Sequence, residues 1–266
     1  MLISDIFNYM NLIIIFLLGL SIGSFLNVLI DRLPAGESIW IDRSHCDSCR
    51  KTLNWYDLIP VISFIILQRK CRNCHKKISW QYPLVEAATG LFFLFTYVSM
   101  IRITGTDLTV PHLIYYLILV ASLIAIFVTD LKYRIIPDQI LIFLTILTVV
   151  YQFIYFPQFI KDNLISGIIS LLFFLMLVII TRGKGMGLGD VKLAFVMGLL
   201  LGFPKIIVAL YLSFLTGAVV SLILILIHKK SMKSTIAFGP FLVFSTLTTI
   251  FYGNYFWQLF QKIFTL

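Results

Sequence analysis

The chain has 266 residues, of which 60% are hydrophobic and only 12% are charged, and its formal net charge is +9 at pH 7. Soluble globular domains contain about 25% charged residues, so this composition excludes an ordinary soluble protein. It predicts instead an all-α polytopic membrane protein.

Apolar stretches long enough to cross a bilayer follow one another along the chain. A transmembrane helix needs about 20 predominantly apolar residues. We predict about eight such helices, at residues 7–30, 83–101, 112–129, 139–156, 164–181, 189–203, 205–228 and 239–260. No basic residue precedes the first stretch and no small-residue cleavage site follows it, which indicates a retained span rather than a signal peptide.

Basic residues cluster in alternate connections between these helices. Of the 21 lysines and arginines, 17 fall in the segments 31–82, 130–138, 182–192 and 229–238. Cytoplasmic segments of membrane proteins are enriched in Lys and Arg, so we expect these four to face the cytoplasm and the N-terminus to lie outside. The positive charge therefore indicates topology and attraction to the lipid bilayer, and it predicts no nucleic-acid partner.

All four cysteines lie in the connection between the first two predicted helices, as Cys46-x2-Cys49 and Cys71-x2-Cys74. Two CxxC pairs at this spacing present four thiolates to a tetrahedral Zn²⁺ ion. A pair of disulfides is the alternative, which a reducing cytoplasm disfavours. A structural zinc site also explains how a loop with little apolar mass folds. We therefore predict a cytoplasmic zinc-binding loop.

Two aspartates stand at the predicted ends of membrane helices. Asp130 ends the third span, and Asp190 closes the motif Gly185-x-Gly187-x-Gly189-Asp190 at the start of the sixth. Charged residues at membrane depth are rare and usually functional. Because the topology brings both to the cytoplasmic face, they predict an aspartyl catalytic pair. The alternatives are a charged loop end for Asp130 and a helix N-cap for Asp190.

Five further residues are candidates for substrate binding. Gly185, Gly187 and Gly189 carry no Cβ atoms, so a substrate backbone can approach the strip they form. Glu86 lies one turn into the second helix, where it binds a cationic group or accepts hydrogen bonds near the helix N-terminus. Asn27 lines a polar site or belongs to small-residue packing. We interpret Gly239-Pro240 only as the entry to the last helix.

Several motifs together resemble the type IV prepilin peptidase family, in family order across about residues 15–245. They are Gly23-Ser-Phe-Leu-Asn-Val28 with Arg32-Leu33-Pro34, the two CxxC pairs, Tyr82-Pro-Leu-Val-Glu86, Asp130 with Ile136-Pro137-Asp138, and Gly185-Met-Gly-Leu-Gly-Asp-Val-Lys-Leu193. Two small departures are Gln81, where an arginine is expected, and Ala237, where a proline often stands.

The resemblance implies a bifunctional enzyme of the bacterial plasma membrane. Such an enzyme removes the short basic leader of type IV prepilins or pseudopilins and then N-methylates the new terminus, with S-adenosylmethionine as methyl donor. It implies Asp130 and Asp190 as the catalytic pair and zinc on the four cysteines. It also implies an amino-terminal methylation region at residues 1–105 and a peptidase domain at residues 106–266.

Other functions remain as alternatives from the residues alone. A cation or proton-coupled transporter would use Asp130 and Asp190 within its pathway, although transport sites usually lie near the bilayer midplane. A membrane scaffold would use only the zinc-binding loop. A metalloprotease is disfavoured, since four cysteine ligands leave zinc no open position. The sequence contains no glycine-rich fingerprint that locates an S-adenosylmethionine site.

For the peptidase, two close carboxyl groups share one proton because both cannot ionise easily. Asp190 at a helix N-terminus and Asp130 at a helix C-terminus then predict Asp190 as the base and Asp130 as the acid. Acidic residues of the cytoplasmic loop are candidates for docking a basic leader; they are Asp31, Glu37, Asp42, Asp47 and Asp57.

Overall fold

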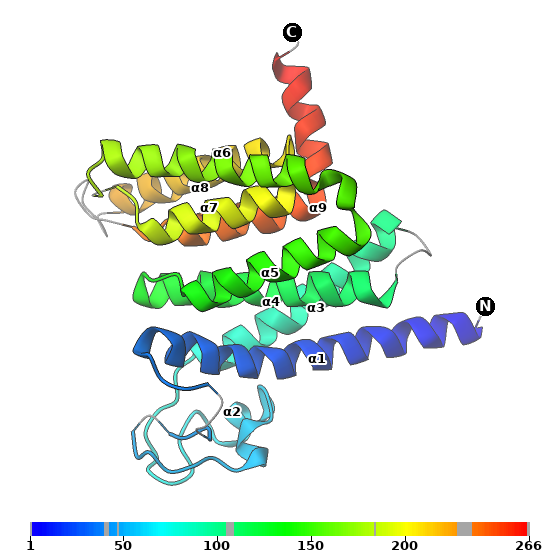
Figure 1. Ribbon diagram of the computed structural model, residues 1–266. Helices are drawn as coiled ribbons and strands as arrows, with labels where there is room; N and C mark the ends of the chain where they lie inside the picture. The colour runs from blue at the N-terminus through cyan, green and yellow to red at the C-terminus, as the bar shows by residue number, and fades with distance from the viewer. Residues whose placement is uncertain are drawn as a thin grey trace. The chain divides into compact units, whose positions relative to one another are not determined.

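The computed structural model describes residues 2–39, 43–46, 48–104, 109–183, 185–227 and 236–264 (Figure 1). All regular secondary structure in these ranges is helical, apart from the isolated bridges His45–Thr52 and Lys70–Lys77. The all-α prediction is confirmed. The chain divides into two compact units, residues 1–125 and 126–266, whereas the boundary expected after residue 105 stays a prediction.

Six of the helices in the described ranges are long and apolar enough to cross a membrane. They cover Met10–Ala35, Gln81–Ile103, Val110–Tyr133, Asp138–Tyr155, Pro157–Ile180 and Lys205–Leu226. The other two predicted spans form α7 (Leu188–Leu201) and α9 (Gly239–Phe264), which are not among the six. The chain is therefore a multi-pass membrane protein, but a count of eight spans is not confirmed.

The first unit is built on the pairing of α1 (Leu2–Ala35) with α3 (Gln81–Thr104). Glycines bring the two backbones together: a Cβ atom on Gly19 would lie 2.7 Å from the Cα of Gly90. Small residues allow this close approach between membrane helices. Between α1 and α3 the loop forms the short helices η1 (Trp55–Leu58) and α2 (Ile62–Ile66).

The helix α4 (Val110–Tyr133) runs from the first unit into the second, which continues with five α-helices and a short 3-10 turn. These are α5 (Asp138–Tyr155), η3 (Pro157–Phe159), α6 (Ile160–Ile180), α7, α8 (Lys205–Leu226) and α9. Short connections favour neighbouring antiparallel helices, and α6 packs against α7 while α8 packs against α9.

The centre of the second unit is α7. It contacts α5, α6, α8 and α9, and most of its side chains are buried. Its 14 residues end at Gly202, whose φ of 63° is readily adopted by glycine. From α5, the buried amide of Gln152 donates a 2.7 Å hydrogen bond to the Leu199 carbonyl. Although α7 is the shortest of the long helices, other helices pack against it on several sides.

The contact between α6 and α7 depends on glycine, so adding one methyl group at this contact should destabilise the protein. A Cβ atom on Gly198 would lie 2.6 Å from the Cα of Gly167. We expect Gly198→Ala to lower the free energy of unfolding by about 1–3 kcal/mol, because the backbones must separate. Thermal unfolding in detergent measures this effect.

A matched control is Gly217→Ala in α8, where the nearest atoms are 3.3 Å away and belong to the Phe238 and Phe241 rings. Its expected effect is near neutral, because rings can shift and alanine favours a helix. Equal thermal midpoints for both variants would contradict the close packing of α6 on α7.

Candidate functional site

Asp190 is held at the first turn of α7 by the loop that precedes it. The helix begins at Leu188 after the N-cap residue Gly187, so Asp190 is the third helical residue and not the cap itself. Its Oδ2 accepts a 3.0 Å hydrogen bond from the Gly187 backbone N–H. Only 8% of Asp190 is exposed. The motif therefore positions a buried carboxyl group at a helix N-terminus, where negative charge is favoured.

Asp130 lies in the last turn of α4 and is buried as deeply, with 5% exposed. Its Oδ2 atom is buried and makes no hydrogen bond of good geometry among the described residues, although the Gly239 backbone lies against the carboxyl group. Buried carboxyl oxygens are normally hydrogen-bonded, so an unpaired one is a candidate to bind a substrate group or water. The nearby charge of Arg134 acts on this carboxyl group.

The two acids share one site. The charge of Asp130 acts directly on Asp190, and the buried side chain of Ile136 lies between the segments that carry them. A Cβ atom on Gly189 would lie 3.1 Å from Ile136, and one on Gly239 would lie 3.2 Å from it. The predicted pair is thus brought together by the α4–α5 connection, α7 and the start of α9.

Gly239 is a residue whose role the sequence analysis missed. It begins α9, and its backbone lies against the Asp130 carboxyl group: a Cβ atom there would lie 2.5 Å from Oδ2 and 3.0 Å from Cγ. The only signal in the sequence was the Phe238-Gly239-Pro240 motif, interpreted there as a helix entry. No spacing rule connects residues 130 and 239, so only the tertiary structure shows the contact.

The three glycines of the motif differ in their surroundings. Gly185 and Gly187 are exposed, while Gly189 is half-buried against Ile136. Nothing lies within 3.6 Å of a Cβ atom built on Gly187. A Cβ atom on Gly185 would lie 3.1 Å from the Thr181 side chain, so the open backbone beside Asp190 is that of Gly187, and substrate binding by these glycines stays a prediction.

The other two predicted substrate-binding residues lie in the first unit. Asn27 connects α1 to α3, and Glu86 connects α3 to the loop. The Asn27 amide donates to the Tyr82 carbonyl at 3.1 Å. Buried Glu86 accepts a 2.7 Å hydrogen bond at Oε2 from the Val61 N–H. Both side chains therefore have structural partners, and their substrate roles stay predictions.

The four cysteines form a candidate metal centre. The Sγ atoms of Cys46, Cys49, Cys71 and Cys74 all lie within 4.8 Å of one another, and none is in a disulfide. Four thiolates at this separation suit a tetrahedral metal ion. The cluster confirms that these residues could bind a metal.

Both CxxC turns fold in the same way. The N–H groups of Cys46 and Cys71 donate to the carbonyls of Lys51 and Lys76, at 3.0 and 2.9 Å. Backbone hydrogen bonds from Cys74 and Asn73 lower the pKa of the Cys71 thiol to about 7, which favours the thiolate that a metal needs. In the same turn, a backbone hydrogen bond from Lys76 lowers the pKa of Cys74, but desolvation and the neighbouring thiols outweigh it and raise that pKa to about 11. The thiolate is therefore favoured at Cys71 and not at Cys74.

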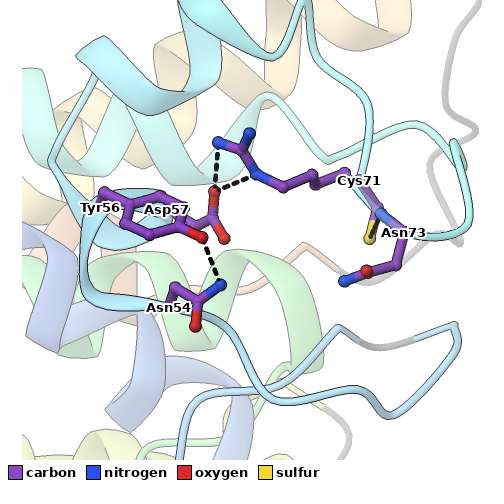
Figure 2. Close-up of polar contacts among 6 residues, drawn as sticks. Asn54, Tyr56, Asp57, Cys71 and Asn73 are labelled. Atoms are coloured by element: carbon purple, nitrogen blue, oxygen red, sulfur yellow. Dashed lines mark hydrogen bonds and ion pairs between the residues drawn. The ribbon is translucent and has the colours of Figure 1, made fainter.

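An ion pair connects the second turn to η1 (Figure 2). Arg72 lies 2.9 Å from the Asp57 carboxylate, whose side chain is 4% exposed, and its guanidinium also stacks over the Tyr56 ring. Asp31 likewise accepts a hydrogen bond from the Tyr82 hydroxyl. Of the acids predicted to dock a leader, these two have partners, exposed Glu37 is accessible, and Asp42 and Asp47 lie outside the described residues.

Comparison with protein families gives two matches. Residues 17–100 match the model of the bacterial peptidase A24 N-terminal domain, and residues 117–222 match that of the type IV leader peptidase family. No solved structure matches the chain significantly.

Curated relatives match over most of the chain. The prepilin leader peptidase/N-methyltransferase of Bacillus subtilis is 31% identical over 91% of this chain and 94% of its own. Proteins with the same name from Myxococcus xanthus and Aeromonas salmonicida are 32% and 29% identical. These matches cover 80% and 91% of this chain, and 63% and 90% of the relatives. Together with the two acids buried in one site, they show that the chain belongs to the type IV leader peptidase family.

Proposed function

We propose that this protein cleaves the basic leader from type IV prepilins or pseudopilins and N-methylates the new amino terminus. Membership of the family and the names of its relatives support both activities. The observation that carries the peptidase activity is the burial of Asp130 and Asp190 in one site at the start of α7. A transporter is not favoured, because the curated relatives are named as peptidases.

Asp130 and Asp190 perform the hydrolysis as a pair that holds one proton. The ionised carboxylate takes a proton from water, which attacks the scissile carbonyl, while the protonated acid donates a hydrogen bond to the carbonyl oxygen. The tetrahedral intermediate then collapses, and the leaving amine takes a proton from the acid formed in the first step. No metal ion is required for these reaction steps.

We assign the resting proton to Asp130, for a reason that the sequence did not contain. Helix dipoles alone no longer separate the two acids, because the N-terminus of α9 lies against Asp130 just as α7 begins at Asp190. The quality of the hydrogen bonding separates them. Asp190 accepts a 3.0 Å hydrogen bond at Oδ2 from the Gly187 N–H, a contact that favours a carboxylate. At Asp130 the Gly239 backbone lies against the carboxyl group, but Oδ2 makes no hydrogen bond of good geometry within the described ranges.

Substrate access follows from the glycine strip and the predicted orientation. We place the N-terminus outside and the dyad at the cytoplasmic face of the bacterial plasma membrane, where a prepilin leader would also lie. Gly187 is exposed beside Asp190, and the nearest side-chain atom to a Cβ atom built on it is the Asp190 Oδ2 at 3.7 Å, so an extended substrate backbone can approach the acid there.

We assign the four cysteines to a structural Zn²⁺ ion. Four thiolates favour zinc and leave it without an open coordination position, so the ion would stabilise the loop and not react. S-adenosylmethionine is the methyl donor implied by the family, and the first unit carries the methyltransferase region. Glu86 and Asn27 are the candidates in that unit for contact with the amino terminus of the product.

Substitution of either acid tests the peptidase mechanism. We expect Asp130→Asn and Asp190→Asn each to reduce cleavage by roughly four orders of magnitude, as happens when one member of a catalytic unit is removed. Purified protein in detergent, a prepilin-like peptide and intact-mass spectrometry measure leader loss and methyl addition together.

The matched control is Asp138→Asn. Asp138 forms an exposed ion pair with Lys192, and such pairs contribute about 0–1 kcal/mol, so cleavage should continue near the wild-type rate. Survival of cleavage in both Asn variants of the dyad would disprove the mechanism.

Gly239→Ala tests the contact between α9 and Asp130. The new Cβ atom would collide with Oδ2, and a displacement of about 1 Å at a reacting group can cost on the order of 10²-fold in rate. We expect kcat for cleavage to fall by roughly that factor with KM little changed. Methylation of a leader-free substrate should persist, which separates a local effect from unfolding. An unchanged kcat would remove Gly239 from the site.

Metal removal tests the cysteine centre. We expect the wild-type protein to contain about one zinc ion per chain and Cys71→Ser to lose most of it, because the tetrahedral site then lacks a thiolate. Elemental analysis gives the metal content, and limited proteolysis of residues 43–80 reports whether the loop unfolds. A zinc-free wild-type protein with a stable loop would contradict this assignment.

A further inference from the structure

The short helix α2 carries an apolar face that the catalytic and metal sites do not use. Ile62, Ile65 and Ile66 are 55%, 67% and 70% exposed. On the opposite side, Phe64 is buried and its ring lies 5.0 Å from that of Trp80, just before α3. The packing of Phe64 therefore sets the orientation of the helix, with the three isoleucines pointing away from the unit.

The position of α2 along α1 indicates what covers this face. Val61, directly before α2, donates to Glu86, and the Cα of Glu86 lies 2.6 Å from a Cβ atom built on Gly23. Gly23 precedes Asp31, the first charged residue toward the end of α1, by a rise of about 12 Å along the helix. The start of α2 is thus held beside the apolar part of α1, not beyond its end (Figure 1).

Charge and aromatic residues around α2 fit a bilayer boundary. The exposed cations Lys70, Lys76 and Lys77 follow it, and Trp55 and Trp80 are 76% and 54% exposed. Tryptophan is enriched at membrane interfaces, and lysine there attracts anionic headgroups. Both ends of the loop continue into membrane helices, which tether the loop to the bilayer surface.

We propose that α2 is a membrane-interface anchor, which inserts Ile62, Ile65 and Ile66 among the lipids of the leaflet at the C-terminal end of α1. Insertion buries apolar surface that water would otherwise contact. Through Phe64 and Val61, the anchor fixes the cysteine-rich loop against α1 and α3. The occupant of this face is lipid, and neither a second copy of the chain nor a protein partner is needed.

Photo-crosslinking identifies the occupant directly. A benzophenone amino acid is placed at position 65, and in a second variant at position 66, of the full chain in nanodiscs of phosphatidylethanolamine and phosphatidylglycerol. We expect lipid adducts by intact-mass spectrometry, at yields close to those from the same label at position 13. Ile13 is an exposed residue of the α1 span and serves as the positive control. Lys51, exposed in the loop, is the negative control.

Other outcomes overturn the proposal. A crosslinked dimer would show that a second copy covers the face, and yields no higher than those at position 51 would show that it faces water. In a second measurement, Ile65→Ser should lower the thermal midpoint in nanodiscs, whereas a water-exposed isoleucine would tolerate serine without loss. Neither readout depends on cleavage or methylation, so the result is independent of the proposed enzymatic function.

Discussion

The cost of burying carboxyl groups in a largely apolar protein is the constraint on which the rest of this structure depends. An isolated charge in such surroundings is expensive unless dipoles or hydrogen bonds compensate it. Here the compensation is backbone: the Gly187 N–H group and the first turn of α7 for Asp190, and the start of α9 for Asp130. Because the backbone groups at helix ends compensate the buried charge, the acids must lie where helices begin or end.

Glycine makes this arrangement possible by allowing backbones to approach where side chains would separate them. Gly198 lets α6 lie on α7, which holds the helix that carries Asp190, and Gly239 lets α9 reach the Asp130 carboxyl group. The same device pairs α1 with α3 through Gly19 and Gly23. In lipid, where apolar side chains gain little by leaving their surroundings, close backbone contact is a main source of helix association.

The cysteine-rich loop follows a different physical principle. It has few buried apolar side chains, so its shape depends on the thiolate cluster, the Arg72–Asp57 pair and the Glu86–Val61 hydrogen bond. The last of these explains why a carboxylate stands one turn inside α3. The Glu86 carboxylate accepts the hydrogen bond of the Val61 N–H group. Val61 has a φ of 60°, which is unfavourable for a β-branched residue. We infer that the bilayer supplies the remaining apolar contacts.

The sequence by itself determined the class of the protein, most of its helices, the cysteine cluster and the two acids, because these depend on composition and local spacing. The family resemblance rested on the same local motifs. Tertiary structure alone decided that Gly239 lies on Asp130, that Asp190 is a third helical residue held by Gly187, and that α2 turns three isoleucines outward. It also showed that α7, predicted as a short helix at residues 189–203, contacts α5, α6, α8 and α9. These features depend on which distant backbones meet, and neither periodicity nor charge encodes that.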